Sequence, residues 1–171
     1  MYKFSVFVLI VIFSNITLSA QNIKWQNSIG GSKIEWLNSI EYTNDGNYLV
    51  GGYSFSGISG DKTEDARGNN DFWILKIDKD SGALIWQKTI GGRFREFAST
   101  TKQTSDGGYI IGGYSNSNIS GDKTENSRGN DDYWVVKLDS DRNVVWDKTY
   151  GGSDVDRLWT LIETEDGGYL L

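Results

Sequence analysis

YLVGGYSFSGISGDKTEDARGNNDFWILKID occupies residues 48–78, and a close copy, YIIGGYSNSNISGDKTENSRGNDDYWVVKLD, occupies residues 109–139. The two copies begin 61 residues apart, and both contain the heptapeptide ISGDKTE, at residues 58–64 and 119–125. A repeat of this length is typical of an array of small structural units, each of which buries its apolar faces against its neighbours. The sequence therefore predicts a repeat protein.

Each repeat unit predicts four β-strands. Aromatic and β-branched residues dominate the strand segments, and an Asp-Gly turn separates the first strand from the second. Runs such as YLVGGY and FWILKI are apolar at nearly every position, which indicates a sheet that is buried on both faces. The predicted strands are residues 36–43, 48–54, 71–78 and 83–90, then 97–104, 109–115, 132–139 and 144–150.

This pattern predicts an all-β fold, a β-propeller-like array of four-stranded antiparallel blades that is incomplete within the chain. A β-sandwich or a β-solenoid is the alternative architecture. The predicted partial propeller spans residues 21–171 and divides into four parts. These are a closing-type strand at residues 23–29, repeat 1 at 35–90, repeat 2 at 96–150 and a truncated repeat 3 at 156–171.

The first twenty residues have the features of a signal peptide. Lys3 supplies a positive charge, residues 4–13 are an apolar run, and small residues precede Gln21. The run is shorter than the roughly 20 apolar residues that a membrane span needs. We therefore expect residues 1–20 to be removed and the mature chain to begin at Gln21, with an N-terminal membrane anchor as the alternative. The expected localisation is secreted or cell-surface.

Composition excludes several classes of function. The net charge is −6, which gives no electrostatic attraction to nucleic acid or to anionic lipid, so we expect no nucleic-acid partner and no membrane insertion after signal cleavage. The chain has no cysteine and no histidine. It therefore lacks disulfides, the commonest general base and the usual zinc ligands.

The ISGDKTE loops carry the candidate metal ligands. Asp61 and Glu64 in the first copy, and Asp122 and Glu125 in the second, offer hard oxygen atoms of the kind that calcium prefers. The loops do not contain a complete D-x-[DN]-x-[DN]-G calcium motif. The alternative is a self-bonded loop in which short polar side chains cap their own backbone turns.

Three further acids, Glu35, Glu96 and Asp156, fall at one repeat position just before the predicted first strands. Paired carboxylates could perform glycoside hydrolysis. An acid at every repeat instead indicates a shared structural role, because a catalytic centre is a single place that breaks repeat symmetry. The sequence assigns no catalytic residue, and no cofactor other than the calcium considered above.

The runs WQKTIGG (86–92), TSDGGYIIGGYS (104–115) and SGDKTENSRGNDDYWVVKLD (120–139) resemble repeats in large secreted proteins of the Bacteroidota. Those proteins have propeller-like repeats of about 60 residues and often a C-terminal sorting domain for type IX secretion, which we do not find here. Because the last residues match the beginning of a second strand, we expect the chain to be a fragment of a longer protein.

The resemblance implies a noncatalytic secreted or cell-surface repeat module that acts as a binding or structural scaffold, with an extracellular protein or glycan as its partner. The alternative is part of a carbohydrate-active propeller enzyme that uses paired carboxylates.

Overall fold

The computed structural model describes residues 22–171, and this part of the chain is all-β, with ten strands and no helix. The predicted signal peptide, residues 1–20, lies outside the described residues. Within residues 22–171, no helix long and apolar enough to cross a membrane is found.

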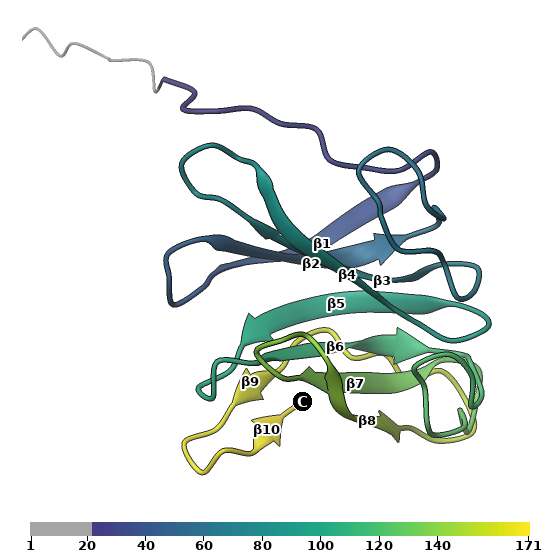
Figure 1. Ribbon diagram of the computed structural model, residues 1–171. Helices are drawn as coiled ribbons and strands as arrows, with labels where there is room; N and C mark the ends of the chain where they lie inside the picture. Colours follow the sequence, from purple (N-terminus) through teal and green to yellow (C-terminus); the bar gives the residue numbers. More distant parts are fainter. Residues whose placement is uncertain (1–21) are drawn as a thin grey trace, which may run out of the picture.

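The strands form two four-stranded antiparallel sheets, each of which follows the order of the sequence (Figure 1). This confirms the predicted four-stranded repeat, and each observed strand differs from its predicted range by no more than one residue at either end. Unit 1 comprises β1 (Glu35–Tyr42), β2 (Tyr48–Ser54), β3 (Asp71–Ile77) and β4 (Leu84–Ile90). Unit 2 comprises β5 (Glu96–Gln103), β6 (Tyr109–Ser115), β7 (Asp132–Leu138) and β8 (Val144–Tyr150), and the short strands β9 (Ile162–Glu163) and β10 (Tyr169–Leu170) belong to unit 3, residues 156–171.

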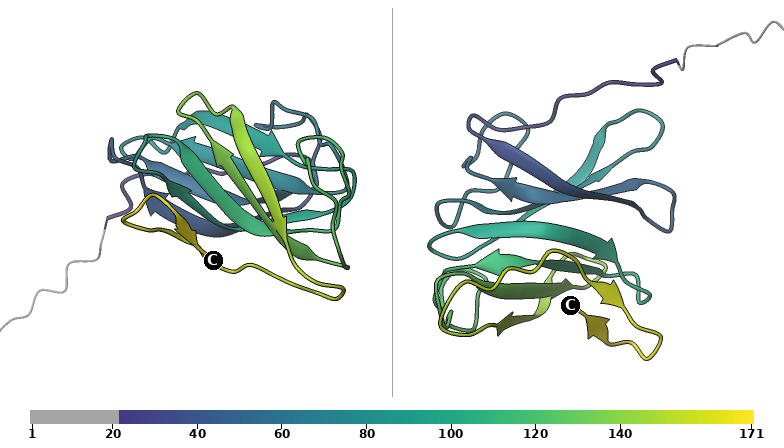
Figure 2. Two further views of the ribbon diagram at one scale, coloured as in Figure 1. Left: turned by 90° about the horizontal axis from the view of Figure 1, so that it is seen from below. Right: turned by 180° about the vertical axis from the view of Figure 1, so that it is seen from behind.

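The two sheets lie in successive layers, with β5 against the sheet of unit 1 (Figures 1 and 2). The contact joins what we call the tail face of unit 1 to the head face of unit 2. Phe72 of the tail face and Trp134 of the head face place their ring centroids 4.9 Å apart. The tail face comprises Leu49, Phe72, Ile74 and Ile90, and the head face comprises Ala98, Tyr109, Ile111, Trp134, Val136 and Leu138.

The same arrangement continues from unit 2 to unit 3. Ile110 and Val135 lie on the tail face of unit 2 and pack with Leu158 and Leu161 of unit 3. On the other side of unit 1, Val50, Trp73 and Leu75 form its head face. Each unit therefore has the same polarity, and the units stack head to tail.

The glycine pair in each second strand is required by two close approaches. A Cβ atom on Gly51 would lie 1.7 Å from Oγ1 of Thr101, which belongs to the next unit. A Cβ atom on Gly52 would lie 1.8 Å from the carbonyl oxygen of Trp36, next to the register shift in β1. The first glycine thus admits the neighbouring unit, and the second admits the irregular first strand of its own sheet. Gly112 and Gly113 are equally crowded in unit 2.

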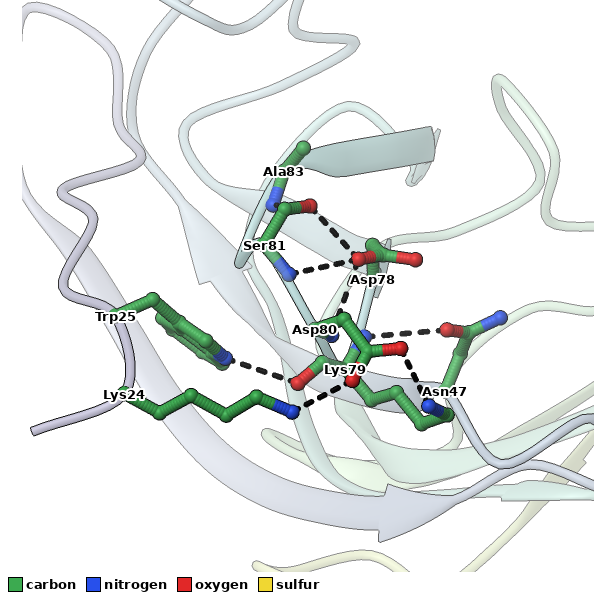
Figure 3. A network of polar contacts seen from close by, with 8 residues as sticks. All are labelled: Lys24, Trp25, Asn47, Asp78, Lys79, Asp80, Ser81 and Ala83. Atoms are coloured by element: carbon green, nitrogen blue, oxygen red, sulfur yellow. Dashed lines mark hydrogen bonds and ion pairs between the residues drawn. The ribbon is translucent and has the colours of Figure 1, made fainter.

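The predicted closing-type strand at residues 23–29 is not formed, since residues 22–31 contain no strand. A closing strand would pair with the third strand of another blade, and the two third strands of the four-stranded sheets, β3 and β7, already have a neighbour on each edge. The segment nevertheless packs on unit 1 (Figure 3). Trp25 donates a hydrogen bond of 3.0 Å from Nε1 to the carbonyl of Lys79, and Lys24 pairs with Asp80 at 2.6 Å.

Trp25 takes the position that the fourth-strand tryptophan holds in the other units. Its ring lies 6.2 Å from that of Tyr48, edge to face. Trp86 lies 5.2 Å from Tyr109 with the same edge-to-face geometry. The Trp146 and Tyr169 rings pair in the same way across units 2 and 3, at 5.8 Å. Residues 22–30 therefore make the tryptophan–tyrosine contact that a preceding unit would make, although they form no sheet.

Candidate functional site

The ISGDKTE sequences lie in two docking loops, residues 55–70 and 116–131, which connect the second strand of each unit to the third. Each docking loop binds the Gly-Gly segment that precedes the first strand of its own unit. Asp122 donates its N–H to the carbonyl of Gly91 (2.9 Å), and its Oδ2 accepts the N–H of Gly91 (3.0 Å). Asp61 and Gly30 make the same two bonds, at 2.8 and 3.1 Å. We call each such arrangement a joint.

Serine hydroxyls of the docking loops complete the joint. The N–H of Arg93 donates to Oγ of Ser120 (2.9 Å), and the N–H of Ser32 donates to Oγ of Ser59 (3.0 Å). The joint between units 1 and 2 also contains an ion pair, in which Nε of Arg67 lies 2.5 Å from Oδ2 of Asp122. The Ser-Gly-Asp core of the loop is thus identical in the two copies because it binds the same backbone in both. Two further hydroxyls, of Ser56 and Ser117, accept the N–H groups of Lys33 and Phe94.

The glutamates of the docking loops bind the fourth strand of their own unit. Oε2 of Glu64 accepts the N–H of Thr89 (2.6 Å), and Oε2 of Glu125 accepts the N–H of Thr149 (2.8 Å). Lys148 donates to the other oxygen of Glu125 at 2.7 Å. This hydrogen bond is the main reason that the pKa of Glu125 lies below its ordinary value.

The lysines of ISGDKTE are buried beneath the loops. Nζ of Lys62 donates to Oγ1 of Thr89 (2.6 Å) and to the carbonyl of Glu64 (2.7 Å). Lys123 bonds to Thr149 in the same way. Burial lowers the pKa of both lysines, because the charged form loses its hydration. Each buried lysine therefore links its docking loop to the fourth strand by a hydrogen bond.

This arrangement does not fit a calcium site at Asp61, Glu64, Asp122 and Glu125. The polar partners of these carboxylates are N–H groups, and in three of the four a Lys or Arg side chain as well, whereas calcium is bound by convergent oxygen atoms. Within residues 22–171, no group of three or more acidic side chains is placed to hold a metal ion. The four carboxylates bind other segments of the chain instead, Asp61 and Asp122 the Gly-Gly segments and Glu64 and Glu125 the fourth strands, so these side chains do not cap their own loop as the alternative expected.

The acids at the shared repeat position, Glu35, Glu96 and Asp156, lie next to the Gly-Gly segments, and two of them accept hydrogen bonds from the second glycine. Glu96 is fully buried, and its Oε1 accepts the hydroxyls of Ser115 (2.8 Å) and Ser117 (2.6 Å). Its Oε2 accepts the N–H of Gly92 (2.8 Å). Burial raises the pKa of Glu96, with a further contribution from the charge of Asp71. A carboxylate so enclosed has no access to a glycoside, and its bonds account for the recurring acid. The equivalent acids make the corresponding bonds, Glu35 to Ser54 and Ser56, and Asp156 to Gly152.

Two further buried aspartates, Asp71 and Asp132, lie at the start of the third strands. Oδ2 of Asp71 accepts the N–H of Arg67 (2.8 Å), and Oδ2 of Asp132 accepts that of Arg128 (2.6 Å). Oδ1 of each finds no hydrogen-bond partner among the described residues, and burial raises the pKa of Asp71. A Cβ atom on Gly91 would lie 1.7 Å from Oδ1 of Asp71. The recurrence of this aspartate together with the Gly-Gly pair was the available signal.

An aromatic row crosses the joint between the units, and the sequence analysis missed it. Trp36 stacks on Tyr53 with centroids 6.5 Å apart, and Tyr53 meets Phe97 edge to face at 4.7 Å. Phe97 stacks on Tyr114 at 4.9 Å, and the guanidinium of Arg157 lies 4.9 Å from the Tyr114 ring. Trp36 is 56% exposed and the other three rings are partly exposed. The pairs Trp36/Phe97 and Tyr53/Tyr114 recur at the repeat spacing, which was the signal in the sequence.

No known protein-family model matches the chain, and no curated protein is significantly similar to it. The joints and the aromatic row are therefore the features from which a function can be inferred.

Proposed function

We propose that this chain is a noncatalytic repeat module, secreted or displayed at the cell surface, that acts as a binding or structural scaffold. The observation that carries the proposal is the use of the recurring acids. Asp61, Asp122 and Glu96 accept hydrogen bonds from the Gly-Gly segments, and at the joint between units 1 and 2 the ion pair of Asp122 with Arg67 links the two consecutive units.

The proposed architecture is a stack of propeller-like blades. Support comes from the repetition of one contact, in which the first strand of a unit lies on the glycine of the preceding second strand. Thr101 lies on Gly51 between units 1 and 2, and Leu161 lies on Gly112 between units 2 and 3. A two-sheet sandwich does not call for this third layer, whereas blades repeat the contact at every step.

The proposed partner is an extracellular protein or a glycan, and the aromatic row is the surface proposed to bind it. Partly exposed rings offer apolar area at low conformational cost, and the Tyr53 and Tyr114 side chains carry phenolic groups beside it. The guanidinium of Arg157, which is paired with Asp131, lies over the ring at one end of the row.

Export is proposed from residues 1–20 and from the resemblance to secreted Bacteroidota repeat proteins, in which type IX secretion is common. We expect N-terminal sequencing of the protein from its native host to begin at or near Gln21. Recovery of a chain that retains Met1 in the membrane fraction would contradict export by a cleaved signal.

The structural role of the joint is tested with Asp122→Asn. The amide retains one acceptor oxygen but loses the charge that faces Arg67 and the N–H of Gly91, so the free energy of unfolding should fall by about 1–3 kcal/mol. Asp141→Asn is the matched control, because Asp141 is exposed in the turn between β7 and β8. Denaturant unfolding measures both. Equal stability of D122N and D141N would contradict a stabilising role of the Asp122 carboxylate in the joint.

A further inference from the structure

The head face of unit 1 is largely uncovered at β1, whereas the equivalent segments of units 2 and 3 are covered. Leu37 and Ile40 of β1 are 57% and 59% exposed. Their counterparts in unit 3, Leu158 and Leu161, are 2% and 1% exposed because they pack on the tail face of unit 2. The unit 2 counterparts, Ala98 and Thr101, are both fully buried on the tail face of unit 1.

A cavity of about 240 Å³ lies beside these residues on the head face of unit 1. Residues 22–30 cover only part of the face, through Trp25 and Ile29. The remaining surface is mainly apolar and includes two tryptophans, Trp36 and Trp73. The cavity is lined by Trp25, Asn27, Ile29, Glu35, Trp36, Leu37, Val50, Gly52, Trp73, Leu75, Ile77 and Gly82.

We propose that the head face of unit 1 docks on the tail face of unit 2 in a second copy of this chain. Leu37 and Ile40 of one copy would take the places of Leu158 and Leu161 over Gly112 of the other. The inference rests on the stacking geometry of the units and extends the scaffold role to self-assembly.

The residues at the exchanged positions match in size and polarity. A leucine at position 37 replaces a leucine at 158, and an isoleucine at 40 replaces a leucine at 161. Gly112 has no side chain, so it accepts either pair, and a Cβ atom there would lie 2.6 Å from Leu161. A cavity of about 400 Å³ remains beside unit 3 on this face, lined by Val135, Trp146, Lys148, Tyr150, Tyr169 and Leu171. Unit 3 therefore fills the tail face incompletely.

Charge favours the same register. Within the chain, Lys102 of β5 pairs with Glu41 of β1 in the preceding unit. In unit 3 the counterpart of Lys102 is Ile162, which is 50% exposed and offers no charge. A second copy docked by its head face would bring its own Glu41 to the free side of Lys102, and the alternation of acid and base would continue across the contact.

The exchange requires residues 156–171 to leave the tail face. These residues contribute strands of only two residues each, β9 and β10, whereas unit 1 presents a complete four-stranded sheet. The resulting contact joins different surfaces of the two copies, so it propagates to rings or filaments rather than closing as a symmetric dimer.

Sedimentation velocity over a concentration series tests the proposal with the purified chain. We expect the wild type to form dimers and larger species, and L37D/I40D to remain monomeric. L158D/L161D frees the tail face, so it should associate at about tenfold lower concentration than the wild type. Ile58→Asp is the control, because Ile58 is exposed on the docking loop, away from both faces. Circular dichroism establishes that each variant is folded.

Thiol cross-linking fixes the register independently, because the chain has no cysteine. A mixture of the single variants Glu41→Cys and Lys102→Cys should give a mixed dimer with a short bismaleimide, whereas either variant alone should not. Association of L37D/I40D at the wild-type level, a wild type that stays monomeric throughout, or absence of the mixed dimer would each overturn the proposal. Stability of D122N, the test of the scaffold role, does not depend on any of these outcomes.

Discussion

Acidic residues in this chain fall into two groups with opposite effects on the pH dependence of folding. Glu96 and Asp71 are buried at the joint between units 1 and 2, and burial raises the pKa of each. Asp106 lies in a turn, where a hydrogen bond from Lys137 holds its pKa well below the usual range. Asp80 has its pKa lowered to about 2, first by Lys24 and then by Lys79.

The first group predicts that the fold is more stable at mildly acidic pH than at neutral pH. A raised pKa means that the folded state holds the proton more tightly than the unfolded chain. The contribution of Glu96 is therefore greatest below its ordinary pKa of 4.5, and it is lost as the pH rises through the raised value. The lowered group, including Asp106, loses its contribution only as the pH falls below 3.8.

Glu96→Gln should flatten this dependence. The amide is neutral at all pH values, so the free energy of unfolding should change less between mildly acidic and neutral pH than it does in the wild type. Some slope should remain, because Asp71 is unchanged. The overall stability should fall, since the amide NH₂ group would oppose the N–H of Gly92.

Urea unfolding across this pH range measures the slope. Glu35→Gln is the control, because Glu35 accepts the hydroxyls of Ser54 and Ser56 as Glu96 accepts those of Ser115 and Ser117, but it is less buried. A slope in E96Q as steep as that of the wild type would show that Glu96 does not carry the effect.

The residues of the joint could be predicted from the sequence only in part. The identity of ISGDKTE in two copies indicated that the loop has a fixed role, but the self-bonded alternative does not describe Glu64 and Lys62, which both bind Thr89 of the fourth strand. The partners of Asp122 could not be predicted, because Gly91 is distant from it in the sequence and Arg67 comes from the preceding unit. The burial of Asp71 could not be predicted either, because Gly91, against which its Oδ1 lies, belongs to the segment that follows β4.

At the scale of the strand, the glycine pair sets how closely two units approach. Gly51→Ala places a Cβ atom against the Thr101 hydroxyl, and we expect this to lower the free energy of unfolding by about 1–3 kcal/mol. Thr101→Ala alone should cost little, since that hydroxyl is buried without a hydrogen-bond partner among residues 22–171. The double variant should recover part of the loss, because the closest clash, with Oγ1, disappears while Cβ of residue 101 remains 2.8 Å from the added Cβ atom.

A double-mutant cycle measures this coupling by thermal or urea unfolding. Direct contact predicts a coupling free energy of about 0.5–3 kcal/mol, whereas independent sites would give additive losses. Additivity would mean that β5 shifts away from β2 instead of pressing on it, and that the glycine does not set the spacing.

The strands themselves were the most predictable elements. Their apolar runs and Asp-Gly turns specify a four-stranded meander without reference to any other unit, which is why all eight long strands lie where the sequence placed them. Residues 23–29 have the sequence of a fourth strand but form none. A strand needs a partner edge as well as a suitable sequence, and both third strands of the four-stranded sheets, β3 and β7, are already paired on each edge.

At the scale of the whole molecule, stability depends on contacts between units and not on covalent links. The chain has no cysteine, so no disulfide restrains the stack. Unit 1 gains a buried face from unit 2, and unit 2 gains one from each neighbour. In such arrays the end units have fewer neighbours and are expected to be the first to open.

The joint also bears on how a gene for such a protein changes over time. Gly30 meets Asp61 as Gly91 meets Asp122, so both seams are built from the same atoms. An in-frame duplication or deletion of one 61-residue stretch would leave every seam already complementary, with no new surface to evolve. The Gly-Gly pairs fall 61 and 60 residues apart, so a turn absorbs a change of one residue, whereas loss of part of a strand or of the docking loop would separate the Gly-Gly segment from the loop that binds it. Selection can therefore lengthen or shorten the array by whole repeat units. The docking loop, whose ISGDKTE sequence resembles a ligand-binding motif, makes each such change tolerable.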